Sequence, residues 1–138
     1  MTALTSKRDT PERAGTERSL GVAANAVIHQ GALVCRNASG FVVPGSTATT
    51  LVALGRAEES VTGSAVNGAV KVEVKAGVFR WANSSAGDLI TVADIGSDCF
   101  VVDDDQVAKT DGTGTRSRAG VVVDVDTLGV WVRTGLRS

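Results

Sequence analysis

The stretch that decides the fold is VKVEVK, residues 70–75, in which valines and charged residues alternate without interruption. Successive side chains of a β-strand point to opposite faces of a sheet. The pattern therefore places Val70, Val72 and Val74 on one face and the three charged side chains on the other. We predict a half-buried strand here, with one face in a core and the other in solvent.

Short apolar runs separated by turn residues extend outward from this strand. Residues 31–45 predict a hairpin, because ALVC and FVV flank the turn residues 37–40. Residues 119–133 predict a closing hairpin, in which two valine-rich runs flank a turn at residues 126–129. Ala76 and Gly77 predict a further hairpin turn, after the strand 70–75 and before the run VFRW at 78–81.

Two shorter apolar runs, LITV at 89–92 and CFVV at 99–102, predict edge strands. The segment from Ala108 to Arg118 is polar and rich in Thr, Gly and Arg, so we expect a long loop there. No apolar periodicity of helical spacing supports a long helix.

These segments predict an all-β protein with a small β-barrel or β-sandwich body of short antiparallel strands and hairpins. A length of 138 residues fits one domain. Residues 1–19 are mostly charged and polar, so we expect a flexible, extended N-terminal arm that a partner would order. Residues 20–138 then form the single β domain.

Composition argues against several classes of partner. Lys and Arg number 14 against 15 Asp and Glu, so no net charge attracts nucleic acid or an anionic membrane. Five aromatic residues, three Phe and two Trp with no Tyr, are a poor supply for base-stacking or sugar-binding surfaces. Without an apolar signal core or a membrane-length apolar run, we expect synthesis in a cytosol. The sequons at Asn37 and Asn83 then read as turn sequence.

Catalytic chemistry has little support in the sequence. Serine catalysis needs a base, and the one histidine, His29, follows an apolar run with no nucleophile elbow. Cys35 and Cys99 each sit in an apolar run and predict buried thiols. We expect no enzyme, and a hydrolase built on Cys or His29 stays as a third alternative.

Metal and cofactor binding are also not expected. The run Asp103–Asp105 lacks the alternating Asp spacing and distal Glu of a calcium loop, and adjacent carboxylates occupy opposite sides of an extended chain. Residues 112–118 resemble a phosphate cradle but lack the Lys-Ser/Thr ending and a following helix. This loop is either an ordinary connection or a contact surface that uses Arg116 and Arg118.

The stretch from Val70 through Arg133 resembles the capsid decoration proteins, also called cement or head-stabilising proteins, of tailed bacteriophages. The matching pieces are short and follow one another in order. They are VEVKAGVF (72–79), Asn83-Ser84, ITVADIG (90–96), CFVVDD (99–104), VAK (107–109), AGVVVDVD (119–126) and GVWV (129–132).

This resemblance implies a non-enzymatic β-body on the outer surface of an assembled phage head, made in the host bacterial cytoplasm. Its partners would be the major capsid protein and two further copies of itself, as a homotrimer at three-fold and quasi-three-fold positions. The family's flexible N-terminal segment is similar in character to residues 1–19. The alternative is a receptor- or carbohydrate-binding β module displayed on a virion, against which the scarce aromatic residues count.

We expect the arm and the loop 108–118 to face the capsid. The candidate contact residues are Leu4, Thr5, Lys7, Arg8, Arg13, Arg18, Arg116 and Arg118.

Overall fold

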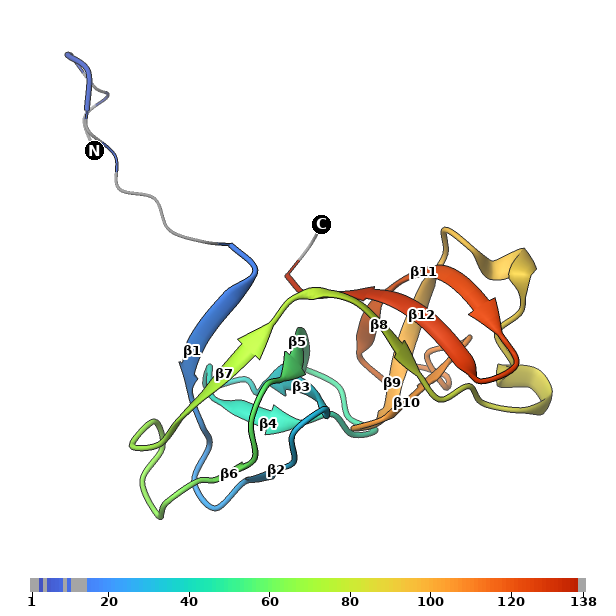
Figure 1. Cartoon of the computed structure of the whole chain (residues 1–138), viewed down its shortest axis with the longest axis horizontal. Coiled ribbons are helices and arrows are strands. Elements are labelled where there is room, and N and C mark those ends of the chain that lie inside the picture. The colour runs from blue at the N-terminus through green and yellow to red at the C-terminus, as the bar shows by residue number, and fades with distance from the viewer. Residues whose placement is uncertain (1–2, 4, 9, 11–14, 137–138) are drawn as a thin grey trace.

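Two five-stranded sheets lie side by side and contain all but two of the strands of the described chain (Figure 1). The computed structural model describes residues 3, 5–8, 10 and 15–136. All paired strands are antiparallel, and the predicted all-β class is confirmed. Neither sheet closes into a barrel, and their arrangement is compatible with a sandwich.

The first sheet, with a short accessory sheet, occupies residues 17–76, which we call the N-terminal unit. In spatial order its strands are β1 (Glu17–Gly21), β7 (Lys71–Lys75), β5 (Val52–Ala57), β3 (Leu33–Arg36) and β4 (Val42–Pro44). Two further strands, β2 (Val27–Ile28) and β6 (Val61–Thr62), pair with each other.

The second sheet occupies residues 77–136, the C-terminal unit. In spatial order its strands are β10 (Gln106–Ala108), β9 (Asp98–Asp103), β11 (Arg118–Asp126), β12 (Gly129–Thr134) and β8 (Gly77–Trp81). Two 3-10 turns, η1 (Ala86–Asp88) and η2 (Val92–Asp94), lie between β8 and β9.

The two units share one connectivity. Taken in chain order, β1, β3, β4, β5 and β7 correspond to β8, β9, β10, β11 and β12, and the spatial orders then coincide. In each unit the residue that follows the first strand forms a parallel bridge to the third, Val22 with Val42 and Ala82 with Gln106. The chain therefore folds the same five-strand pattern twice.

A bulge at the same place supports this correspondence. The fourth strand of each unit carries a glycine at a shift in register, Gly55 in β5 and Gly120 in β11. A Cβ atom on Gly55 would lie 2.2 Å from the Lys75 carbonyl oxygen, and one on Gly120 would lie 2.1 Å from that of Arg133. Glycine is needed at both bulges because the next strand's backbone comes so close.

When Gly55 is matched to Gly120, the strand registers of each unit assign counterparts in the other unit to its interior strand positions. Each member is buried or packs against the buried residues of its own unit. The pairs are Leu20/Trp81, Val34/Cys99, Val42/Val107, Leu54/Ala119, Ala57/Val122, Val72/Val130 and Val74/Val132.

Two clusters of buried residues form the core. The N-terminal cluster includes Ile28 of β2, and the partly buried Val61 of β6 packs against it. The other cluster fills the C-terminal unit but also takes Leu33, Cys35 and Ala53 from the N-terminal sheet. The outer face of the N-terminal unit therefore completes the core of the C-terminal unit.

The predicted hairpins at 31–45 and 119–133 are present as β3–β4 and β11–β12. In the strand VKVEVK, Val72 and Val74 are fully buried, while Lys71 and Glu73 are exposed, as predicted.

The hairpin predicted at Ala76–Gly77 is wrong. β7 pairs with β1 and β5, whereas β8 pairs with β12 in the other sheet. The chain passes from one sheet to the other here, as the green β7–β8 run in Figure 1 shows. Ala76 instead donates its backbone N–H to the Thr16 carbonyl, at 2.7 Å.

The strand predicted over residues 99–102 is present as β9, but it lies between β10 and β11 and not at an edge. The strand predicted over residues 89–92 is wrong. Asn83 accepts a hydrogen bond from the Ile90 backbone N–H and donates one to its carbonyl, at 3.0 and 2.9 Å, which holds Ile90 buried without a partner strand. Thr91 and Asp94 then form a capping box at η2. These local side-chain hydrogen bonds outcompete strand pairing.

Candidate contact surfaces

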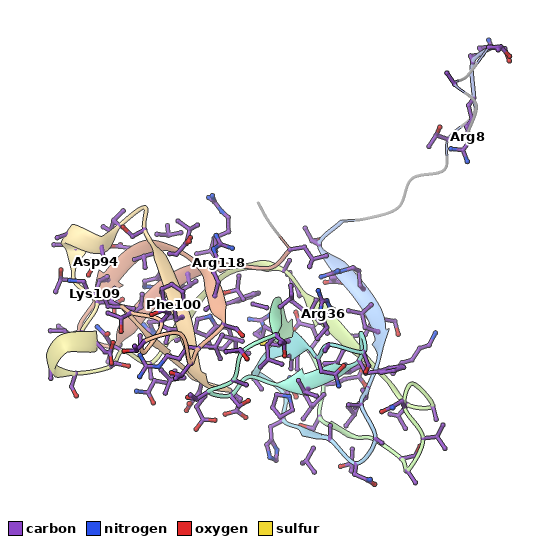
Figure 2. The ribbon with its side chains drawn as sticks, turned by 180° about the vertical axis from the view of Figure 1, so that it is seen from behind. Arg8, Arg36, Asp94, Phe100, Lys109 and Arg118 are labelled. Carbon is purple, nitrogen blue, oxygen red and sulfur yellow. The ribbon has the colours of Figure 1, made fainter. Side chains whose placement is uncertain are left out.

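Three of the contact residues predicted for the N-terminal arm belong to its described part and are not in a strand. Thr5, Lys7 and Arg8 are exposed, and Figure 2 shows Arg8 well away from the β-body. Leu4 and Arg13 lie outside the described residues. Two cationic side chains are thus available to a partner on this segment.

Arg18 belongs to the sheet and not to a free arm. Residues 17–19, assigned to the arm from sequence, form the start of β1. The Arg18 Nη2 atom lies 3.4 Å from the Leu54 carbonyl oxygen, and its Nε atom is buried without a partner. This side chain lies against β5, so its role is at least partly structural.

Arg116 is held within its own loop. Its Nη1 atom donates to the Thr110 carbonyl at 3.1 Å and lies 3.2 Å from an Asp88 carboxylate oxygen. The pKa of Asp88 is lowered, first because Thr110 donates a hydrogen bond to it and then because Arg116 lies beside it. The guanidinium therefore ties the loop to η1 and is mostly shielded from a partner.

Arg118 is more accessible. Its Nε atom lies 2.7 Å from an Asp98 carboxylate oxygen, and its side chain remains 38% exposed. It lines a small cavity of about 130 Å³ together with Leu51, Val52, Ala53 and Gly135. Arg18 and Arg118 thus both reach β5, whereas Arg116 lies with η1.

A groove that sequence reasoning missed runs beside β8. Its volume is about 310 Å³, and its lining residues are Gly31, Arg56, Val78, Phe79, Arg80, Trp81 and Trp131. The Arg56 guanidinium carbon lies 4.5 Å from the centre of the Phe79 ring, and that of Arg80 lies 5.4 Å from the Trp131 ring. The alternation in 78–81 marks the strand, but only the fold brings Arg56 and Trp131 to it.

The run Asp103–Asp105 lies at the turn between β9 and β10, so the extended-chain argument does not hold there. One carboxylate oxygen from each Asp lies within 4.8 Å of the others. The pKa of Asp104 is raised by partial burial and then by its two acidic neighbours. Exposed acidic clusters are common without an ion, and this one assigns no metal. His29, exposed after β2, lies across a shallow depression from Asp104.

Both thiols are buried, as predicted. Burial raises the pKa of Cys35 and of Cys99 to about 12, so both remain protonated at neutral pH. Because the thiolate is the nucleophilic form, this argues against cysteine catalysis at either position.

Comparison with known proteins gives no match. No protein-family model fits the chain, and neither a curated protein nor a solved structure is similar to it. Among the described residues, no helix is long and apolar enough to cross a membrane.

Proposed function

We propose that this protein is a non-enzymatic decoration, or cement, protein of a tailed-phage head. It binds the outside of the assembled, expanded head and stabilises contacts between capsomers of the major capsid protein. The observation that carries the proposal is an exposed segment with the cations Lys7 and Arg8, which precedes the edge strand β1 of a β-body. The sequence resemblance over residues 70–133 supports it.

The physical logic favours many modest contacts over one strong one. A bound copy that touches several capsomers buries area at their seams, and avidity multiplies weak individual contacts. Ordering the N-terminal segment on the shell has an entropic cost. Binding should therefore favour the expanded lattice, where its landing surface is complete, over free subunits.

Co-sedimentation tests the proposal directly. Purified protein is mixed with expanded, undecorated heads of its own phage and, separately, with unexpanded heads at the same concentration. We expect saturable binding to expanded heads only, with three copies at each three-fold or quasi-three-fold position. Absence of binding to either kind of head would overturn the decoration role.

The N-terminal segment can be tested separately because β1 begins at Glu17. Deleting residues 2–15 should abolish head binding and leave thermal unfolding of the β-body nearly unchanged. The variant K7A/R8A removes two cations without shortening the segment, and T5A/S6A is its matched control because it keeps both cations. Comparison with the deletion variant then separates the effect of charge from that of length. If the deletion variant bound heads as tightly as the wild type, the contact with the head would lie on the β-body and not on the N-terminal segment.

A second candidate, a virion-displayed carbohydrate-binding module, is favoured by the groove beside β8. Three of the five aromatic residues line it, with Arg56 and Arg80 alongside. Trp81 is only 4% exposed, so a sugar that quenches tryptophan fluorescence would report on Trp131. Saturable quenching by a glycan, lost in Trp131→Ala, would favour this function over decoration.

A further inference from the structure

The first strand of each unit has an open edge. β1 and β8 are both terminal strands of their sheets. In an antiparallel strand, the backbone N–H and C=O groups of alternate residues point to opposite sides. Bonds at the strand ends therefore fix which residues point outward along each edge.

Along β8 the outward residues are Val78 and Arg80. Ala82 donates its N–H to Asp105 and accepts from Val107, at 2.8 and 3.0 Å, so its backbone points away from β12. Val78 and Arg80 share that direction by alternation, and neither pairs with another strand of the described chain. Both are exposed, and the groove of about 310 Å³ lies beside them.

Along β1 the outward residues are Glu17 and Ser19. Val22 donates its N–H to Val70 at 2.8 Å, and Thr16 accepts from Ala76, so even-numbered residues face β7. The backbone groups of Glu17 and Ser19 therefore point away from β7, and both residues are exposed. Carried over by register, Glu17 and Ser19 correspond to Val78 and Arg80.

The chain thus has two corresponding open edges at corresponding positions in its two units. In both units the later end of the edge is closed by the parallel bridge to the third strand, so only the first part is free. An exposed edge strand is a template for pairing with another extended chain. Two alike edges suit a partner that is itself present in repeated copies.

We propose that the first parts of β1 and β8 each accept an extended segment of the same shell protein, donated by two neighbouring copies in the lattice. This inference rests on the proposed decoration role and names its partner contact. Main-chain hydrogen bonds along an edge supply binding with little demand on sequence. One decoration chain would then join two shell subunits through two alike contacts.

Proline substitution provides the test, because proline removes an outward N–H yet is tolerated on an edge strand. The variants are Ser19→Pro, Arg80→Pro and the double variant, with Ser19→Ala and Arg80→Ala as matched controls that keep the N–H. Affinity for expanded heads is measured by co-sedimentation, and folding by thermal unfolding. If Arg80→Pro does not fold, Val78→Pro is used, and likewise Glu17→Pro for Ser19→Pro.

We expect each proline to weaken head binding about 10- to 100-fold, because losing one of two linked sites removes avidity. The double variant should bind more weakly still, and the alanine controls should bind as the wild type does. This inference would be overturned if the proline variants bound heads as tightly as the wild type, or if the alanine controls lost as much affinity as the prolines. Either result leaves the decoration role standing as long as the wild type binds heads. The inference would also be overturned if the prolines acted by disrupting self-association of the free protein, since a second copy of this chain would then occupy the open edges. A wild type that binds no head overturns both proposals.

Discussion

The N-terminal and C-terminal units have the same strand order but cover their interiors differently. The N-terminal unit brings β2 and β6 over its own core, with Ile28 only 1% exposed. The C-terminal unit has a tight turn between β11 and β12 where the other unit has the excursion that carries β6. Its core is completed by residues of the N-terminal unit. One unit therefore covers its core with its own strands, and the other relies on its neighbour.

The outer faces of the two units show the same difference. Leu33 of the N-terminal unit is fully buried against the C-terminal unit, and its counterpart by register is the exposed Asp98. Ala53 is buried, and its counterpart is Arg118, which pairs with Asp98. Apolar residues occupy the face that is covered, and an ion pair occupies the face that is not.

Exchanging these counterparts should have the largest effect. Leu33→Asp places an unpaired carboxylate in the shared core, and we expect a loss of about 4 kcal/mol or more in the free energy of unfolding. Asp98→Leu removes only a solvent-exposed ion pair, so its effect should be within about 1 kcal/mol. Denaturant unfolding of both variants measures the contrast, and equal losses would show that the two faces are alike.

The bulge glycines should give a smaller but matched pair of effects. Gly55→Ala and Gly120→Ala each force a Cβ atom against a carbonyl oxygen, so we expect each to destabilise by about 3 kcal/mol. Gly87→Ala is the control, since nothing lies within 4 Å of its added Cβ atom. If only one of the two alanine variants loses stability, the two bulges do not contribute equally to the free energy of unfolding, although they occupy corresponding positions.

The two buried thiols should make stability fall at alkaline pH. Their pKa values are raised to about 12, so the folded state favours the protonated thiols. That stability is fully present below the ordinary thiol pKa and is lost as pH rises toward 12. Unfolding measured from pH 7 to 11 should therefore show a decline starting near the ordinary thiol pKa of about 8.5.

The double variant Cys35→Ala/Cys99→Ala supplies the control for this pH dependence. The chain has no tyrosine to titrate in the same range. We expect lower stability at neutral pH, since two buried side chains are truncated, and a flatter alkaline profile. An unchanged slope would place the alkaline loss on other groups.

Sequence reasoning succeeded where structure is local. The hairpins β3–β4 and β11–β12 follow from alternation around a turn, and both partners lie within one short segment. It failed at Ala76–Gly77 because a turn signal does not say which strands pair, and β7 and β8 find partners in different sheets. It failed at 89–92 because hydrogen bonds from Asn83 replaced strand pairing.

The repeated connectivity was not visible in the sequence because several corresponding positions share burial but not residue type, and the matches that remain are mostly Val/Val pairs, in a chain where valine is common. Leu20 corresponds to Trp81, Val34 to Cys99 and Leu54 to Ala119. Of the predicted contact residues, Lys7 and Arg8 are exposed, but Arg18 and Arg116 are held by the body. The sequence shows where positive charges are, but the hydrogen-bond and ion-pair partners that hold an arginine in place can come from distant segments.

If the protein braces a phage head, the head should become more resistant to heat when the protein is bound, and this is the most direct measurement. Expanded heads with and without saturating protein are warmed with a DNA-binding dye that reports rupture. We predict that decorated heads rupture at a clearly higher temperature than bare heads, and that protein lacking residues 2–15 gives no increase. Heads that bind the protein yet rupture at the same temperature would contradict the claim.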